Sequence, residues 1–388
     1  MSQAVDRRIA RLLDAAEATG SCLAPAAEKD RRALKVRLGR GEVIEPYPGI
    51  FARPDYWATL KPLPRAAHAI RALARLHPTW VFCGPSAGLL WGLWVSNEQV
   101  SHVHVVGRSR GKGNDPASWL CRHDVSTDET AEVGGICMTS LWRSVFDCMR
   151  ASDFRRALAV ADSALKLTGL SPRQLAERLQ EEFRWHPDIR RVLDVCAFAD
   201  ARSDNGGESV ARASMISQGF DVPSLQVRVA DPRAACERRI DFVWMGERGK
   251  LSFGELDGGC KYVDEDMTGG RDAPSVVFDE RRRESAVSVF HPAWVRFSYD
   301  DVLDVRGFVG LLSYFGIARG PAPERPHGVP RRVGGPSSYV VVDEEHCWLD
   351  GDAVLATTLR NTDEAAVQAS RVTQEDLREF LATRPSAA

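Results

Sequence analysis

The chain has 388 residues, of which 44% are hydrophobic and 27% are charged, and its formal net charge is −2 at pH 7. This length allows two or three domains, and the composition is that of an ordinary globular protein rather than of a disordered or fibrous one. The near-neutral charge excludes a uniformly basic nucleic-acid binder, so any basic surface has to be local.

The nine cysteines are scattered, odd in number and without a C-x-x-C pair. This pattern argues against a disulfide framework and against a structural zinc site. The N-terminal segment has charges at helical spacing and lacks a signal-peptide core, and no apolar run approaches ~20 residues. We therefore expect a cytoplasmic protein that does not use a membrane as a partner.

The first elements are helical. Apolar residues at i, i+3, i+4 and i+7 predict an amphipathic helix over 5–18. Short helices are expected over 24–29 and 31–38, followed by two strands across 42–54 that meet at a Pro-Gly turn. Because helix, helix, helix, hairpin is the order of a winged helix-turn-helix, we assign residues 1–58 to such a domain.

The predicted third helix is basic, with only Asp30 to offset its charges. A helix in the major groove of DNA needs such residues for phosphate and base contacts. A solvated basic face is the competing interpretation. Since the basic run coincides with the helix that would enter the groove, we predict DNA contacts from Lys29, Arg31, Arg32, Lys35, Arg37 and Arg40.

The region after the hairpin carries further motifs, and the order of segments 40–51, 83–93, 102–106 and 135–147 resembles the AbiEi-type antitoxins of type IV toxin–antitoxin systems. The resemblance implies a DNA-binding regulator of its own promoter, with a cognate toxin as partner, in a toxin–antitoxin or phage-defence locus. We assign residues 59–200 to an AbiEi-like mixed α/β and helical connector.

The elements expected within this connector follow from periodicity and capping residues. A strand is predicted over 100–106, where His102 and His104 share a face; two histidines are more often ordinary strand residues than metal ligands. The basic loop over 107–113 lacks the spacing of a phosphate-binding loop. Helices are expected over 65–76, 86–93, 139–149, 154–167, 171–183 and 188–199.

Acidic residues gather on two predicted strands between 238 and 262. Asp241 lies on the first strand, and Glu255 and Asp257 lie on the second. Because side chains alternate along a strand, Glu255 and Asp257 share one face, and three carboxylates can converge. Such a concentration favours a shared divalent cation, Mg²⁺ or Mn²⁺, whereas the competing interpretation leaves the acids facing solvent.

The elements on either side of these strands also carry acidic or basic residues. A helix is expected from Gly207 to about Gln218, with Glu208 in its first turn. A basic helix starts at 279–284, and a strand covers 294–298. Over about 204–317 this order resembles the PD-(D/E)XK nuclease superfamily, in particular bacterial domains similar to the very short patch repair endonuclease. The resemblance implies an α/β restriction-endonuclease-like fold that hydrolyses DNA phosphodiesters with a metal ion.

The same resemblance implies residue roles. Asp241 is the central metal ligand, completed by Glu255 and Asp257, and Glu208 orients this ion or binds a second one. Where the superfamily has a lysine two residues after the acid, this chain has Asp257, so Lys261 is the candidate for stabilising charge on the phosphate. Contacts to the phosphates of the DNA backbone are assigned to Arg281, Arg282 and Arg283.

We expect an α+β multidomain chain: a winged helix-turn-helix, a helical and β middle region, the nuclease-like domain at 201–318, and a Pro-rich linker with a small extension at 319–388. Three functions stay open. The first is a metal-dependent DNA endonuclease. The second is an antitoxin-type regulator whose nuclease-like domain is not catalytic, and the third is an interaction partner in a defence cassette without its own activity.

Overall fold

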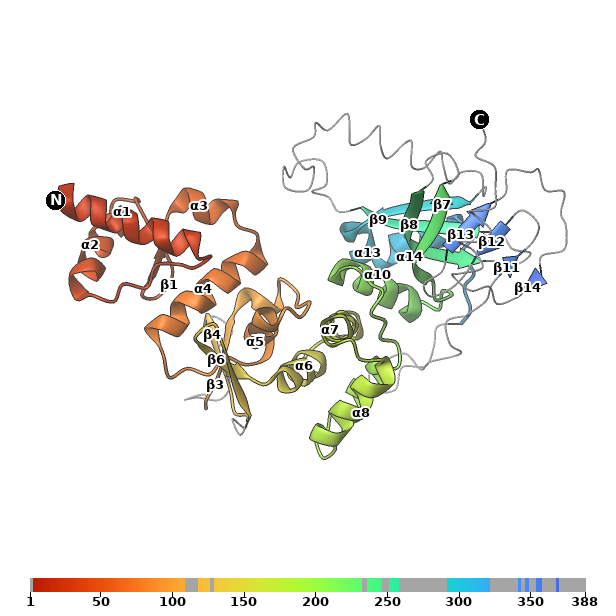
Figure 1. Cartoon of the computed structure of the whole chain (residues 1–388), viewed down its shortest axis with the longest axis horizontal. Helices are drawn as coiled ribbons and strands as arrows, with labels where there is room; N and C mark the ends of the chain where they lie inside the picture. Colours follow the sequence, from red (N-terminus) through yellow and green to blue (C-terminus); the bar gives the residue numbers. More distant parts are fainter. Residues whose placement is uncertain are drawn as a thin grey trace. The chain divides into compact units, whose positions relative to one another are not determined.

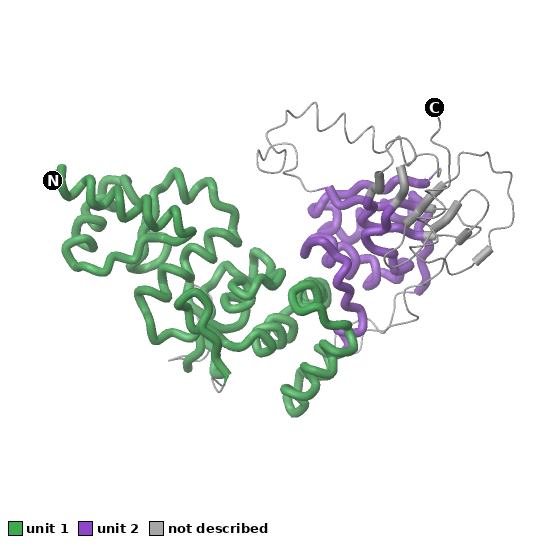
Figure 2. The backbone as a smooth tube through the Cα atoms, in the orientation of Figure 1, with its two compact units in different colours: residues 1–193 green, residues 194–388 purple. Residues whose placement is uncertain are grey.

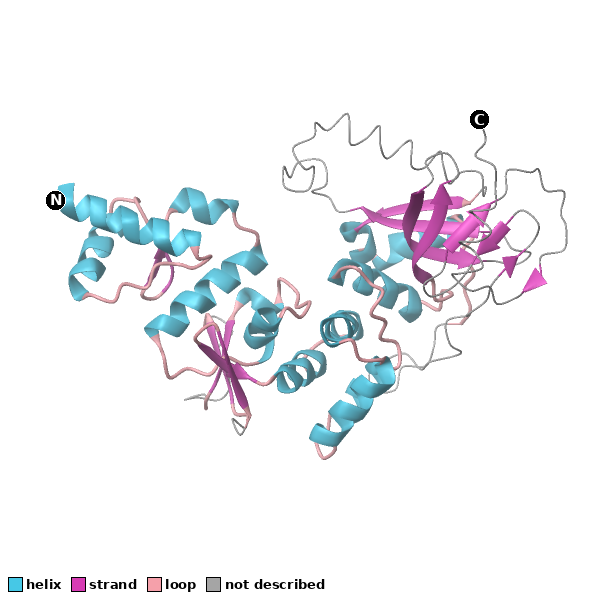
Figure 3. Cartoon of the chain, viewed as in Figure 1, coloured by secondary structure: helices cyan, strands magenta, loops and turns pink. Residues whose placement is uncertain are grey.

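The computed structural model describes residues 3–108, 118–125, 129–231, 236–245, 251–257 and 292–321, together with short strands at 341–342, 346–348, 354–357 and 368–369. The chain forms two compact units, residues 1–193 and residues 194–388, which Figure 2 shows in separate colours. Both contain helices and strands, so the fold is of the mixed α+β, multidomain kind (Figure 3).

The first unit begins with two helices and a hairpin (Figure 1). The predicted first helix is confirmed as α1, Gln3–Ala18, and the basic helix as α2, Glu28–Leu38. Strands β1, Ile44–Tyr47, and β2, Ile50–Ala52, pair in antiparallel fashion. Their shared core buries Ile9, Leu13, Leu34 and Phe51.

The prediction of a separate short helix over 24–29 is wrong, because the first helical residue after α1 is Glu28, at the start of α2. Leu23 exchanges both backbone hydrogen bonds with Phe51, at 2.8 and 2.9 Å, which holds the chain extended at this point. Pro25 adds to this, since a residue before proline is disfavoured in the helical region. Two helices rather than three therefore precede the hairpin.

The middle of the first unit packs helices around short strands. Phe82 lies at its centre: it is fully buried, and it bridges to both Val105 and Met138. Helices α3, Pro54–Thr59, α4, Pro62–Leu76, and α5, Gly84–Trp91, come before the strands. The strands are β3, Val103–Val106, parallel to β4, Leu120–His123, and β5, Thr130–Val133, antiparallel to β6, Ile136–Thr139.

Four helices follow, and each predicted one is present: α6, Leu141–Arg150, α7, Phe154–Thr168, α8, Pro172–Phe183, and α9, Ile189–Cys196. Helix α6 starts two residues later than expected because Thr139 pairs in β6. Ser171 and Gln174 form a capping box at the start of α8, in agreement with the helix start that Ser-Pro predicts.

The second unit is built on one sheet. Strands β7, Ser224–Asp231, β8, Cys236–Met245, and β9, Leu251–Asp257, are antiparallel neighbours, and β10, Ala293–Ser298, pairs in parallel with β9. Beyond β7, strand β13, Val354–Thr357, continues the sheet, followed by β12, His346–Trp348, β11, Val341–Val342, and β14, Gln368–Ala369.

The described part of the second unit contains the helices α10, Gly206–Ser217, α13, Tyr299–Leu303, and α14, Val305–Tyr314. The ring of Phe297 on β10 meets Phe308 of α14 edge-on, at 5.0 Å between centroids, and lies 5.7 Å from Phe242 of β8. Phe242 and Phe297 therefore lie on the apolar face of the sheet, which packs against α14. Asp241 and Arg296 are their neighbours in the sequence, and because side chains alternate along a strand, they lie on the opposite face.

Gly254, directly before Glu255, has no room for a side chain. A Cβ there would lie 2.8 Å from the indole ring of Trp244. The close approach of β9 to this ring therefore depends on glycine. The predicted basic helix at 279–284 and most of the loop over 107–113 lie outside the described residues.

Candidate functional site

Glu208 stands at the start of α10 and is only 4% exposed. Asn205 caps the helix and donates from Nδ2 to Glu208 Oε1 at 2.7 Å, while the backbone N–H of Asp204 donates to Oε2 at 2.8 Å. Burial raises the pKa of the Glu208 carboxyl to about 7, and the charges of Asp241 and Asp204 add to the rise against these hydrogen bonds. Glu208 is thus a buried acid that changes charge near neutral pH.

Gln226 on β7 connects Glu208 with Asp241. Its Nε2 donates to Glu208 Oε2 at 2.9 Å and to Asp241 Oδ1 at 3.3 Å. The other oxygen of Asp241, Oδ2, accepts the backbone N–H of Leu256 at 3.2 Å. One amide therefore holds two carboxylates, and Asp241 is also tied to β9 beside Glu255.

Glu255 is paired with Arg296 across the parallel strands β9 and β10. The two residues are register partners, and the guanidinium donates to Glu255 Oε2 at 2.9 Å. The same guanidinium lies 3.8 Å from Asp257 Oδ2. Glu255 is 7% exposed, and a carboxylate so buried requires a charged or hydrogen-bonded partner. Arg296 supplies that partner.

We refer to Glu208, Asp241, Glu255 and Asp257 as the acidic cluster. Two pairs form within it: Gln226 links the first two acids, and Arg296 contacts the last two. Among the described residues, no group of three or more His, Cys, Asp or Glu side chains is arranged to hold a metal ion. Mg²⁺ is commonly held by one or two carboxylates with waters, so the donor chemistry of Asp241 and Glu255 fits this ion.

Four predicted site residues, Lys261, Arg281, Arg282 and Arg283, lie outside the described residues. Their predicted roles stay predictions.

The basic residues of α2 differ in what they contact. Arg37 is 4% exposed, and its guanidinium donates to the Ala33 carbonyl at 2.9 Å and pairs with Asp6, so it stabilises the packing of α1 on α2. Lys35 is exposed and pairs with Glu45 at 2.7 Å. The remaining arginines form longer pairs: Arg31 and Arg32 with Glu28, and Arg40 with Glu42. Lys29 is exposed and forms no ion pair within the described part of the chain.

A cavity of about 370 Å³ in the first unit is lined in part by His102, His104, His123, Asp147 and Arg150. His104 Nε2 is 3.0 Å from the Gln99 carbonyl, and its Nδ1 is 2.8 Å from His123 Nε2. Because a carbonyl only accepts, His104 carries its proton on Nε2 and accepts from His123. Burial, followed by the neighbouring His123, lowers the pKa of His104 to about 4.

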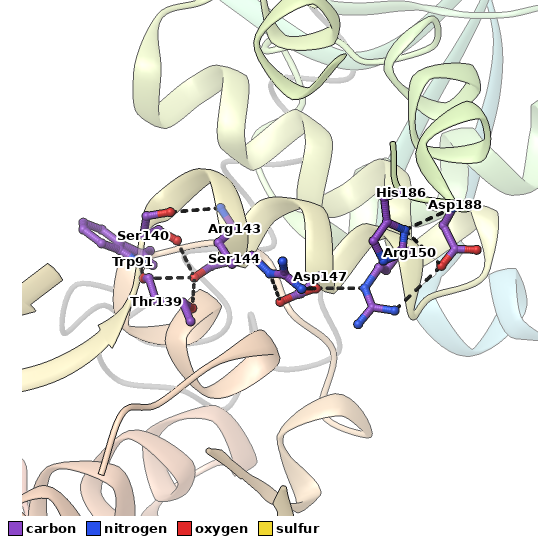
Figure 4. Close-up of polar contacts among 9 residues, drawn as sticks. All are labelled: Trp91, Thr139, Ser140, Arg143, Ser144, Asp147, Arg150, His186 and Asp188. Carbon is purple, nitrogen blue, oxygen red and sulfur yellow. Dashed lines mark hydrogen bonds and ion pairs between the residues drawn. The ribbon is translucent and has the colours of Figure 1, made fainter. Parts of the chain in front are cut away.

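Figure 4 shows the polar contacts along α6 beside this cavity. Arg143 donates twice to Asp147, at 2.8 and 3.0 Å, and Arg150 donates to the same carboxylate at 2.8 Å. Asp188 lies 3.7 Å from both Arg150 and His186. Asp147 is only 6% exposed, so its two arginines neutralise a buried charge at this wall of the cavity.

Two residues of the site carry no signal that singles them out in the sequence. Gln226 lies in a strand whose apolar residues alternate with polar ones, but the alternation does not single out Gln226, and its bridging amide depends on the register between β7 and β8. Arg296 stands out only as part of a strand motif. Its position opposite Glu255 follows from the parallel pairing of residues 252–257 with residues 293–298.

No family model matches the chain. Similar proteins include an uncharacterized protein of Mycobacterium tuberculosis, found in two strains, that is 26% identical over 219 residues. The match covers 55% of this chain and 74% of the relative. Within the described ranges, no helix combines the length and the apolar character needed to cross a bilayer.

Proposed function

We propose that the chain is a DNA-binding protein whose second unit is a metal-dependent endonuclease of the PD-(D/E)XK kind. The observation that carries the proposal is the contact of Glu208, from α10, with Gln226 and, through it, with Asp241, while Glu255 follows on the neighbouring strand. These acids come from elements that are separate in the sequence. The sheet brings them together next to the first turn of α10, where their carboxylate oxygens could bind one metal ion.

The arrangement of strands also supports the proposal. Strands β8, β9 and β10 follow α10 in the order that suggested the superfamily and are neighbours in the sheet, while β7 is an additional strand between α10 and β8. A parallel neighbour requires a crossover connection, and residues 258–291 are long enough to provide one.

In this proposal Asp241 and Glu255 would hold the ion, which when bound would polarise the phosphate and activate a water molecule. Arg296 pairs with the Glu255 carboxylate. Gln226 and Leu256 hold both oxygens of Asp241 in a fixed orientation. Asp257 lies near the same guanidinium and helps to balance its charge. Lys261 and the arginines at 281–283 are proposed to contact the phosphate backbone.

A second candidate function is an antitoxin-type regulator of a toxin–antitoxin locus, in which a winged helix in the first unit binds operator DNA. The observation in its favour is that α2 exposes Lys29, Arg32 and Lys35 beside the β1–β2 hairpin. Both functions require DNA binding by the first unit. They differ in whether the acidic cluster reacts.

The test of the first proposal is nicking of supercoiled plasmid by the full chain in Mg²⁺ and in Mn²⁺. We expect Asp241→Asn to lower the rate by about 100-fold, because it removes a ligand charge without changing the size of the side chain. Asp221→Asn is the matched control, since Asp221 is an exposed acid on the loop before β7. Equal rates for wild type and Asp241→Asn, or a wild type that does not nick DNA in either metal, reject the proposal.

A further inference from the structure

Gln226 on β7 has a backbone conformation that is unusual for a residue with a side chain. Its φ is +53°, in the left-handed region, and no other non-glycine residue within the described ranges has a positive φ. A residue with a Cβ has a steric cost there, and such a conformation in the interior of a strand persists only where surrounding contacts hold it.

The contacts that hold Gln226 belong to the acidic cluster. The residues before and after it, Leu225 and Val227, are fully buried and pair with Phe242 and Ile240, so the strained residue lies across from Asp241. Its Nε2 provides both hydrogen bonds to the carboxylates, while its Oε1 is buried without a hydrogen-bond partner among the described residues. The strain and the unsatisfied oxygen are two costs at one residue, and both lie at the site.

We propose that Gln226 is a positioning residue of the phosphodiester site, whose strained backbone and bridging amide fix the Glu208 and Asp241 carboxylates relative to each other. The inference rests on the proposed function. Only a side chain of this length and type meets the geometry, because a glutamate places a third negative charge between two acids and an asparagine is one methylene shorter.

Two substitutions separate positioning from a purely structural role. Gln226→Gly removes the bridge and the steric cost together, since glycine adopts positive φ readily. It is therefore expected to leave the melting temperature of the full chain unchanged or higher, while the nicking rate falls by about 10- to 100-fold with the KM for DNA within about twofold. Gln226→Leu keeps the strain and loses the bridge, so both its melting temperature and its nicking rate are expected to fall.

The matched control for glycine in this strand is Arg228→Gly, two residues along β7 and with an ordinary φ. It is expected to lower the melting temperature, because glycine inside a strand loses more conformational entropy on folding. A structural role for Gln226 predicts instead that Gln226→Gly lowers the melting temperature as much as Arg228→Gly does, and that outcome overturns the inference whatever the activity.

The remaining outcomes separate the inference from the proposed function. If wild type nicks and both Gln226 variants nick at the wild-type rate, the inference is overturned and the function stands. If wild type and Asp241→Asn are equally inactive, the function fails and the inference falls with it. Lower nicking in Gln226→Gly without a lower melting temperature, and without recovery in Gln226→Glu, supports the inference.

Discussion

Burial and neighbouring groups together set the pKa values of two buried ionisable residues, Glu208 and His104. Glu208 receives hydrogen bonds from Asp204, Asn205 and Gln226, yet its pKa is raised because burial outweighs them. His104 is the opposite case, since burial beside His123 favours the neutral imidazole. Each residue therefore links the stability of its unit to pH.

His104 makes the folded state more stable at neutral pH than at acidic pH. Its folded pKa, about 4, lies below its ordinary value of 6.5, so between these values the unfolded chain takes up a proton that the folded chain refuses. The stabilisation is present above pH 6.5 and is lost as the pH falls toward 4. His102, His123, Asp147 and Arg150 line the same cavity and shape this response.

We predict that the unfolding free energy of wild type falls more steeply than that of His104→Gln between pH 7 and pH 4.5. The difference between the two proteins is expected to change by up to about 3 kcal/mol, from a shift of roughly two units or more. Urea unfolding followed by tryptophan fluorescence at both pH values measures this difference, in which the titration of groups outside the cavity cancels. Parallel pH dependences would contradict the buried, neutral state of His104.

At the scale of elements, α2 has a buried face and an exposed basic face. Arg37 belongs to the buried face and packs α1 on α2, so its removal would test folding rather than DNA binding. Arg32 is 80% exposed, and its pair with Glu28 at 3.2 Å is worth little in water. Such a side chain exchanges its partner for a phosphate at low cost.

We predict that the double variant Lys29→Ala, Arg32→Ala binds duplex DNA more weakly and with a smaller salt dependence. The slope of log affinity against log salt concentration is expected to decrease by about 1 for each phosphate that the variant no longer touches. Fluorescence anisotropy across a salt series measures this slope. Arg173→Ala is the control, because Arg173 is 87% exposed and forms the same i,i+4 pair, with Glu177 at 2.8 Å. Equal slopes for the double variant and wild type would argue against DNA binding through α2.

Local sequence signals locate most helices and several strands. The apolar spacing of α1 and the Ser171 cap of α8 are encoded within one or two turns, so they could be predicted. The start of α2 could not, because the pairing of Leu23 with Phe51 joins distant residues. Alternation in β8 and β9 identified Asp241, Glu255 and Asp257 as candidates, but it could not foresee the left-handed Gln226 between flanking strand residues.

At the scale of the whole molecule, the chain combines two compact units with different chemistry. The first exposes the basic face of α2, and the second contains the acidic cluster. This division is what an enzyme that binds and cleaves DNA requires, and it also suits a regulator with an unreactive second unit. The two proposals therefore differ in one property, which is whether the acidic cluster cleaves DNA, and cleavage requires that the cluster bind a divalent cation.

The most direct measurement is a calorimetric titration of Mn²⁺ into the full chain, with wild type and Asp241→Asn compared under identical conditions. The proposal predicts that wild type binds Mn²⁺ at least about tenfold more tightly than the variant, because the substitution removes one carboxylate charge from the ion. Both proteins should melt at similar temperatures in the absence of metal. Identical isotherms for two folded proteins would contradict a metal site at Asp241 and with it the proposed endonuclease.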